Sequence, residues 1–171
     1  PSHSHPLLQA LADLLTVKQL PGRIEGARIS FIGDGNNNVA RSLAQGCALL
    51  GAELTIASPE GYGLADPPTG VRQLSDPAKA VAGAKIVYTD VWVSMGQAAE
   101  AEARRQALHP YQVDEALMAR ANDAWFLHCL PARRGEEVTD AVIDGARSAV
   151  WRQAQNRMHT VRGAMAWMLG G

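Results

Sequence analysis

The chain has 171 residues, of which 47% are hydrophobic and 19% are charged. These values are typical of one globular domain with a core of its own, and they exclude a disordered chain. The 16 basic and 17 acidic residues leave a formal net charge of -1. This balance argues against nonspecific binding to nucleic acid or to an anionic membrane, because both need a surplus of positive charge. No apolar run approaches the roughly 18 residues of a membrane span, and no leader pattern is recognised.

Two further features bear on the origin of the chain. Cys47 and Cys129 lie far apart and outside any Cys-x-x-Cys pair, which predicts a reducing, cytoplasmic environment and no structural zinc. The first residue is Pro1 and not methionine, so we expect a fragment or a processed chain.

In chain order, helix-like stretches alternate with strand-like stretches. The first helix is predicted over 6–19, where leucines recur on one face. A strand over 27–32 and a helix over 38–50 follow, and Gly51 closes that helix. The segment 91–110 is predicted to be a long loop. The later helices are predicted from Ser75-Asp76-Pro77 onward and over 113–121, 139–143 and 154–169; the later strands are predicted over 53–57, 71–74, 85–89, 125–128 and 148–151.

This alternation predicts the fold class. Short apolar strands separated by helices of about ten residues or more indicate crossover connections, and crossover connections join parallel strands. Parallel sheets are buried on both faces. We therefore expect an α/β fold, a doubly wound Rossmann-like parallel sheet with helices on both faces.

Polar residues gather at the expected carboxyl ends of the strands. Ligands of open α/β sheets bind in the crevice beyond these ends. The distinctive segments, which follow predicted strands, are 33–38, 89–96, 128–131 and 155–159. Four such clusters at one edge of the sheet indicate a binding site there.

The first of these clusters does not fit a dinucleotide site. The fingerprint G-x-G-x-x-G needs a third glycine and an acidic residue closing the second strand, whereas Asn38 stands at the third glycine position and the second strand ends without an acid. The three asparagines offer amides at a helix N-terminus, where backbone N–H groups and the helix dipole favour an anion. They equally fit a local role, in which Asn36 and Asn37 form the turn and Asn38 caps the helix.

The second cluster contains a carboxylate and a hydroxyl. Asp90 ends a predicted strand, where it is placed to hold an ammonium group, and Ser94-Met95-Gly96 follows with a hydroxyl and backbone donors. The alternative is a structural role, with Asp90 as a loop cap and Met95 as a core residue.

The remaining clusters are ambiguous by themselves. His128 and Cys129 are adjacent, so in an extended chain their side chains point to opposite faces and form a poor nucleophile–base pair. Cys129 is either a buried inert thiol or a group at the strand end, since Pro131 and a polar run follow it. Arg157 is either a solvated helix residue or part of an inward polar face.

Taken together, the segments GDGNNN, TDVWVSMG, FLHCLPARRGEEV and AQNRMH resemble the ornithine carbamoyltransferase family in order and spacing. The SMG and HCLP segments are specific to that family. The resemblance covers nearly the whole chain but only the second half of a family member, so it implies a preceding carbamoyl-phosphate domain with a Ser-Thr-Arg-Thr phosphate loop. It divides the chain into an interdomain helix over 1–20, an ornithine-binding α/β domain over 21–152 and a C-terminal helix over 153–171 packing toward the missing domain.

The resemblance implies a carbamoyltransferase that converts carbamoyl phosphate and L-ornithine to L-citrulline and phosphate, with no cofactor and no metal. In this scheme, Asp90 pairs with the α-ammonium of ornithine. Asn38, Ser94 and the backbone at Met95 hold the α-carboxylate and the α-amino group. Asn37 and Asn38 are interchangeable as the ligand, and Asn38 is preferred because it directly precedes an apolar residue.

The resemblance also implies residues for the second substrate. Cys129 and Leu130 position the side-chain amine against the carbamoyl carbon, and Arg157 polarises the carbamoyl oxygen. Asp90, Cys129 and Arg157 are thus the catalytic candidates. His5 and Gln9 resemble an element that touches carbamoyl phosphate, although three residues separate them here and two in the family.

The resemblance leaves two alternatives open and implies an assembly. The alternatives are a carbamoyltransferase for another amine, acetylornithine or putrescine, and a noncatalytic amino-acid-binding module. The family implies a homotrimeric, cytoplasmic full-length enzyme, formed through the other domain. We expect the 171 residues alone to be inactive.

Overall fold

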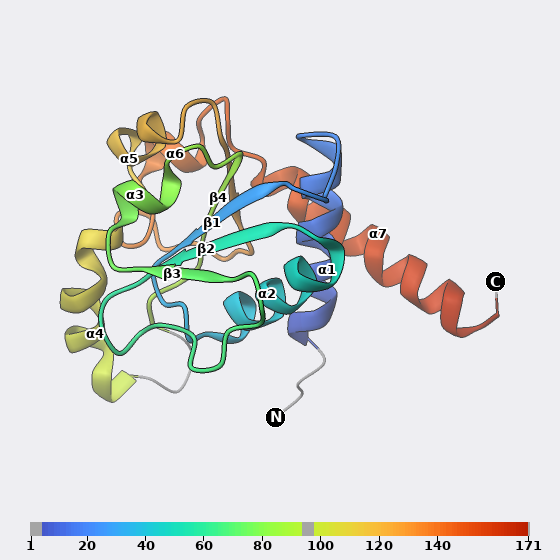
Figure 1. Cartoon of the computed structure of the whole chain (residues 1–171), viewed down its shortest axis with the longest axis horizontal. Helices are drawn as coiled ribbons and strands as arrows, with labels where there is room; N and C mark the ends of the chain where they lie inside the picture. The colour runs from blue at the N-terminus through green and yellow to red at the C-terminus, as the bar shows by residue number, and fades with distance from the viewer. Residues whose placement is uncertain (1–4, 94–97, 171) are drawn as a thin grey trace.

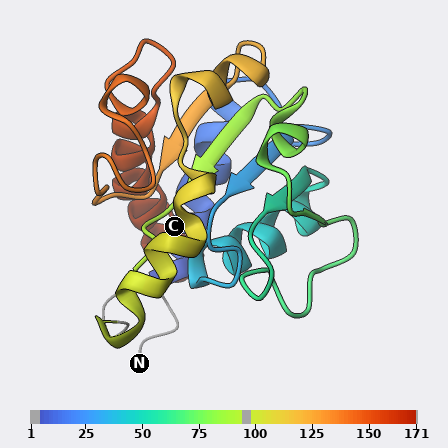
Figure 2. The same ribbon diagram turned by 90° about the vertical axis from the view of Figure 1, so that its left-hand side faces the viewer.

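The computed structural model describes residues 5–93 and 98–170 and contains a five-stranded parallel sheet. The strand order is β3-β2-β1-β4-β5, with β1 at Arg28–Ile32, β2 at Glu53–Ala57, β3 at Arg72–Leu74, β4 at Ile86–Thr89 and β5 at Trp125–His128. Ile32 pairs with Thr89 and Thr89 pairs with His128. Strands β1, β4 and β5 therefore end side by side, at the edge that Figure 2 shows behind α4 (Ala101–Leu108).

Helices cover both faces of the sheet (Figure 1), which confirms the predicted fold class. One face carries α1 (His5–Gln19), α2 (Asn38–Leu50) and α7 (Val150–Met168), and the other carries α3 (Pro77–Val81), α5 (Glu115–Arg120) and α6 (Asp140–Ile143). The short 3-10 helices η1 (Ala98–Glu100) and η2 (His109–Tyr111) flank α4. None of the helices in the described part of the chain combines the length and the apolar character that crossing a bilayer requires.

The core consists of two apolar clusters, one on each side of the sheet. Phe31 and Tyr88 belong to the cluster under α1 and α2, and their rings stack 5.5 Å apart. Their strand neighbours Ile32 and Val87 belong to the opposite cluster, with Phe126. Successive strand residues point to opposite faces, and both faces of this sheet are covered, so all four residues of β4 are buried.

Local capping explains the bounds of α2. The Asn37 side chain accepts a hydrogen bond from the Ala40 N–H at 2.8 Å, which satisfies one of the free donors at the helix start. Gly51 ends the helix with φ +71°, a left-handed conformation that favours glycine. The hydrogen bond of Asn37 therefore holds the first polar cluster, residues 33–38, between the carboxyl end of β1 and the start of α2.

Two predicted elements differ from the structure. The strand predicted over 148–151 is wrong: Ser148 forms only an isolated bridge to Phe126, and α7 begins at Val150. The apolar residues of this segment do not form one buried strand: Val150 is buried and Trp151 is 70% exposed, as expected for neighbouring positions on a surface helix. The loop predicted over 91–110 is also wrong in part, because it contains α4, whose residues are mostly good helix formers without an apolar stripe.

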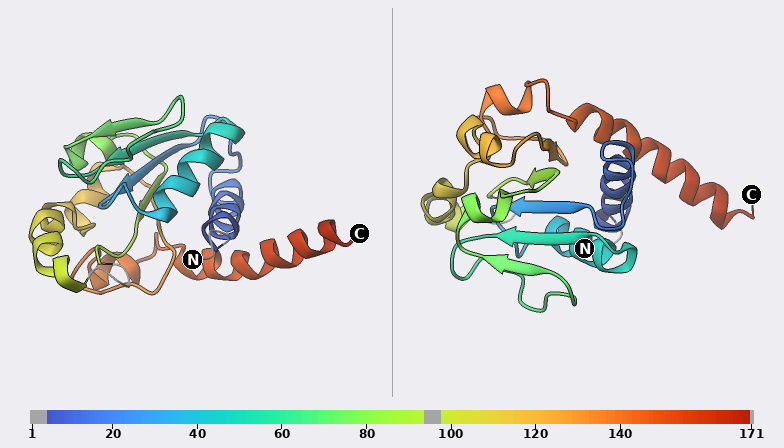
Figure 3. Two further views of the ribbon diagram at one scale, coloured as in Figure 1. Left: turned by 90° about the horizontal axis from the view of Figure 1, so that it is seen from below. Right: turned by 45° about the horizontal axis from the view of Figure 1, so that its top comes forward.

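The end of α7 stands away from the rest of the molecule (Figures 1 and 3). Its first turns pack on α1 and β5, whereas Met165, Trp167, Met168 and Leu169 near its end are at least half exposed. Large apolar side chains exposed together in this way are typical of an interaction surface.

Candidate functional site

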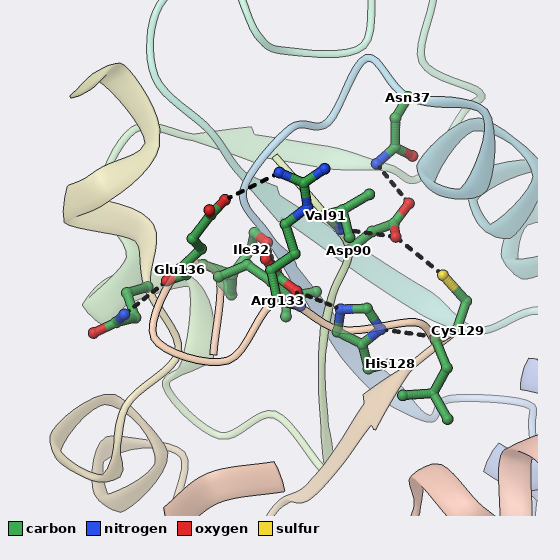
Figure 4. A network of polar contacts seen from close by, with 12 residues as sticks. Ile32, Asn37, Asp90, Val91, His128, Cys129, Arg133 and Glu136 are labelled. Atoms are coloured by element: carbon green, nitrogen blue, oxygen red, sulfur yellow. Dashed lines mark hydrogen bonds and ion pairs between the residues drawn. The ribbon is translucent and has the colours of Figure 1, made fainter. Parts of the chain in front are cut away.

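Asp90 is the centre of the candidate site. It follows β4 and is only 8% exposed. One carboxylate oxygen accepts hydrogen bonds from the Val91 N–H at 2.8 Å and from the Cys129 thiol at 3.0 Å, and the other accepts from the Asn37 amide at 3.2 Å. Figure 4 shows the three donors around the carboxylate. The site thus joins the ends of β4 and β5 to the first turn of α2.

His128 holds the chain segment that presents Cys129. Its Nδ1 accepts a hydrogen bond from the Leu130 N–H at 2.9 Å, so the ring proton is on Nε2, which lies 3.1 Å from the Glu137 carboxylate. The same Glu137 oxygen accepts from the Arg133 N–H at 2.6 Å. The neutral imidazole is therefore a structural bridge within the turn after β5 (Figure 4).

The Cys129 thiol is a hydrogen-bond donor in this arrangement. Burial and then the neighbouring Asp90 charge hold the pKa of Cys129 well above its ordinary value. The sulfur accordingly keeps its proton and donates a hydrogen bond to the Asp90 carboxylate. A thiol in this state orients a carboxylate and does not act as a nucleophile.

The donor atoms of Asp90, His128 and Cys129 lie within 4.8 Å of one another. This spacing alone is compatible with a metal ion. However, the lone pair on His128 Nδ1 already accepts the Leu130 N–H, and its Nε2 faces Glu137. A metal would have to displace one of these bonds, so we assign no metal to the site.

A buried ion pair anchors α4 beside the site. Arg104 of α4 pairs with Asp34, which follows β1, and its Nε donates to the Trp92 carbonyl at 2.8 Å. Its guanidinium also lies 5.0 Å from the centre of the Tyr62 ring. Burial outweighs the attraction of Arg104 and raises the pKa of Asp34. Through these contacts, Arg104 connects α4 to Asp34 at the end of β1 and to Trp92 after β4.

Some of the predicted ornithine residues lie within the described part of the chain and others do not. Asn37, as the cap of α2, faces Asp90 with its amide. Asn38, the asparagine preferred as the ornithine ligand, is the first helical residue and is exposed. Ser94 and Met95 lie outside the described residues.

The predicted carbamoyl-phosphate residues are spread over two helices and one turn. Gln9 is buried on α1 and donates to Asp13 at 2.7 Å, while His5 is the first residue of that helix. Leu130 lies half-buried in the turn after β5. Arg157 is exposed on α7, and α7 packs alongside α1.

Sequence reasoning did not find several residues that hold the site together: Asp13, Tyr88, Arg104, Glu137 and Gln153. Each is a polar residue that the structure buries. The available signal was an acid or a charge within an otherwise apolar helical pattern, as for Asp13 in LADLL, because such a group must find a buried partner.

The fold and this strand-end site are those of an open α/β domain that binds a ligand beyond the carboxyl ends of its parallel strands. Residues 25–168 match the domain family described as aspartate/ornithine carbamoyltransferase, Asp/Orn binding domain. The chain belongs to this family.

Similar proteins agree with this assignment. The ornithine carbamoyltransferase of Hyperthermus butylicus is 50% identical over 96% of this chain and 56% of its own length. The solved structure of the Pyrococcus furiosus enzyme superposes with a TM-score of 0.85 at 46% identity, covering 93% of this chain and 55% of that one. The Gloeobacter violaceus structure gives 0.83 at 40% identity, over 95% and 58%. The chain thus spans a little over half the length of the relatives it matches.

Proposed function

We propose that the chain is the ornithine-binding half of an ornithine carbamoyltransferase. The observation that carries the proposal is the environment of Asp90. It is a nearly buried carboxylate whose partners among the described residues, Asn37, Val91 and Cys129, are all neutral donors. A buried charge needs a partner of opposite sign, and the α-ammonium group of ornithine supplies one. Relatives named for this activity at 45–50% identity support the choice of ornithine.

In this proposal the asparagine cap and the thiol orient the Asp90 carboxylate toward the ligand. We assign the ligand role to Asn37 in place of Asn38, since the Asn37 amide is the one that reaches Asp90. Ser94 and the backbone at Met95 bind the rest of the α-amino acid head. The ligand's side chain then extends toward Cys129 and Leu130, which follow β5.

The chemistry needs a second substrate held by the part of the protein that the relatives have in addition. The neutral δ-amine of ornithine attacks the carbonyl carbon of carbamoyl phosphate, phosphate leaves with the electron pair of the broken C–O bond, and the amine loses a proton. Arg157 stabilises the negative charge that develops on the carbonyl oxygen. With His5, Gln9, Cys129 and Leu130, it completes the carbamoyl-phosphate site.

The division of the site between two parts determines what the chain does alone. Holding two reactants in position accounts for about 7–11 kcal/mol of a barrier, so the 171 residues bind ornithine but do not turn it over. The complete enzyme is a cytoplasmic homotrimer joined through its other domain, and it uses no metal or organic cofactor.

Calorimetric titration of the chain with L-ornithine tests the proposal. We expect binding that Asp90→Asn weakens by about ten- to hundredfold, because a charge-assisted hydrogen bond contributes about 1.5–3 kcal/mol. Asp66→Asn is the matched control, since Asp66 is exposed and the change removes the same charge. Urea unfolding of each variant confirms that it is folded.

Three outcomes would overturn the proposal. Equal ornithine affinity of the wild type and Asp90→Asn would remove Asp90 from the site. Tighter binding of acetylornithine or putrescine than of ornithine would assign the site to another amine. Ornithine binding without citrulline formation after the carbamoyl-phosphate half of a relative is added would favour a noncatalytic binding module.

A further inference from the structure

The outer edge of the sheet ends next to the candidate site. β5 is the last strand in the sheet order, so its outer side faces away from the other strands. The segment before α7 pairs there briefly: the Phe126 N–H donates to the Arg147 carbonyl at 2.8 Å, and the Ala149 N–H donates to the Phe126 carbonyl at 2.9 Å. The next donor along this edge is the N–H of His128, a buried residue directly before Cys129.

A side chain takes over the pairing of this edge at His128. In a parallel ladder the His128 N–H would bond to the Ala149 carbonyl, but that carbonyl accepts the Gln153 N–H at 2.9 Å, in the first turn of α7. The His128 N–H donates instead to the Gln153 side-chain oxygen, also at 2.9 Å. A buried N–H needs such a partner. Gln153 thus takes the next backbone acceptor away from the ladder and supplies another in its place, at the point where β5 ends and α7 begins.

The other half of the Gln153 amide is also held inside the fold. Its Nε2 donates to the Asp13 carboxylate at 2.7 Å and to the Tyr88 hydroxyl oxygen at 3.0 Å. Asp13 in turn accepts from the Gln9 amide at 2.7 Å and from the Tyr88 hydroxyl at 3.1 Å. Because a backbone N–H can only donate, the atom that faces His128 is the amide oxygen. Gln153 is 1% exposed, so its side chain is fixed by buried partners on three other elements, α1, β4 and β5.

We propose that Gln153 is a positioning residue of the proposed ornithine site. Through the His128 N–H it holds the end of β5, which Cys129 and Leu130 follow directly. Arg157 lies one turn further along the same helix. Gln153 therefore sets the turn that carries Cys129 and Leu130 against the helix that carries Arg157. This inference deepens the proposed function and rests on it, but the hydrogen bonds that carry it involve no ligand.

Amide hydrogen exchange of the ligand-free chain, followed by NMR, tests this anchor. Gln153→Met keeps the length of the side chain and removes the amide. We expect the His128 N–H to exchange about five- to hundredfold faster in this variant, because a buried donor loses its acceptor. The N–H groups of Phe126 and Arg133 donate to other acceptors, so their rates stay the same.

Two variants serve as controls for the exchange measurement. Gln153→Glu keeps an oxygen for the His128 N–H. Burial raises the pKa of Asp13 to about 7, so at pH 6 a proton is available for a hydrogen bond between the two carboxyl groups. We expect this variant to exchange as slowly as the wild type. Gln45→Met makes the same change as Gln153→Met at an exposed glutamine of α2 and leaves the His128 rate unchanged.

Ligand affinity tests the positioning role. In the proposed site Asp90 binds the α-ammonium group, and Cys129 and Leu130 position the δ-amine. L-Norvaline has the α-amino acid head and the carbon chain of ornithine but no δ-amine. In calorimetric titrations we expect Gln153→Met to weaken ornithine binding by about three- to tenfold, the loss of about one hydrogen bond, and to leave norvaline binding unchanged.

Two comparisons separate this effect from a general loss of structure. Gln153→Glu restores the ornithine affinity, because it restores the acceptor for the His128 N–H. Asp90→Asn weakens both ligands, since ornithine and norvaline share the α-ammonium group. A role of Gln153 in packing alone lowers both affinities together and is not rescued by glutamate.

Other results would overturn the inference. These are an unchanged His128 exchange rate in Gln153→Met, a parallel rise for Phe126, or a change in ornithine affinity no larger than that for norvaline. If Gln153→Met does not fold, Gln153→Asn replaces it: its amide is one methylene too short to reach His128, and unchanged exchange in that variant contradicts the anchor. If the wild type binds no ornithine, the proposed function fails, and the exchange rates still decide whether Gln153 anchors the end of β5.

Discussion

The buried Asp13 predicts an unusual pH dependence of stability. Its pKa is about 7 in the folded protein and 3.8 in its ordinary state, so between these values the folded chain keeps a proton that the unfolded chain has lost. The free energy of unfolding therefore falls as the pH rises through this range. From pH 5 to pH 8 the loss from this group is about 2–3 kcal/mol, at about 1.4 kcal/mol for each pH unit in which the folded group is protonated.

Asparagine at this position does not titrate, and its shape allows it to keep the bonds to Gln9 and Gln153. We therefore expect Asp13→Asn to gain about 2–3 kcal/mol of stability relative to the wild type between pH 5 and pH 8. Urea unfolding at both pH values, followed by circular dichroism and tryptophan fluorescence, measures the difference. All other titrating groups cancel in this comparison, and Asp66→Asn is again the control. A constant gap between the wild type and Asp13→Asn at the two pH values would refute the reasoning.

Three further predictions concern packing, the ion pair and the transfer step. Gly35→Ala places a Cβ 2.6 Å from an Ile56 methyl and costs about 1–3 kcal/mol in urea unfolding, whereas Gly163→Ala, which meets nothing within 4 Å, costs nothing; equal effects would contradict the packing. Arg104→Met leaves Asp34 buried and unpaired, which costs about 3–5 kcal/mol and shows as a lower urea midpoint; an unchanged midpoint would count against the pair. With the carbamoyl-phosphate half supplied, Arg157→Lys lowers citrulline turnover by about ten- to hundredfold, because lysine lacks the planar fork, and Arg162→Lys on the same helix does not; equal turnover would remove Arg157 from the reaction.

The sequence by itself determined the layering of the fold and the edge at which the site lies. Mainly apolar stretches such as 86–88 and 125–127 are typical of strands buried on both faces. Gly51 ends its helix for local steric reasons. Because parallel strands end together, Asp90 and Cys129 could be assigned to one place without coordinates. The Cys129 thiol does lie 3.0 Å from Asp90.

Only the tertiary structure decided which groups face each other across elements. Asn37 and Asn38 are equivalent in the sequence, and the phase of α2 relative to β4 brings the amide of Asn37 to Asp90. The segment 148–151 has a strand-like composition, but it lies at the edge of the sheet after β5, where only Ser148 pairs and the chain turns into α7. Local pattern is insufficient in such cases, because the partner that stabilises one conformation is distant in the chain. For the same reason the sequence does not reveal the buried contacts of Asp13, because its partners Tyr88 and Gln153 are 75 and 140 residues away in the chain.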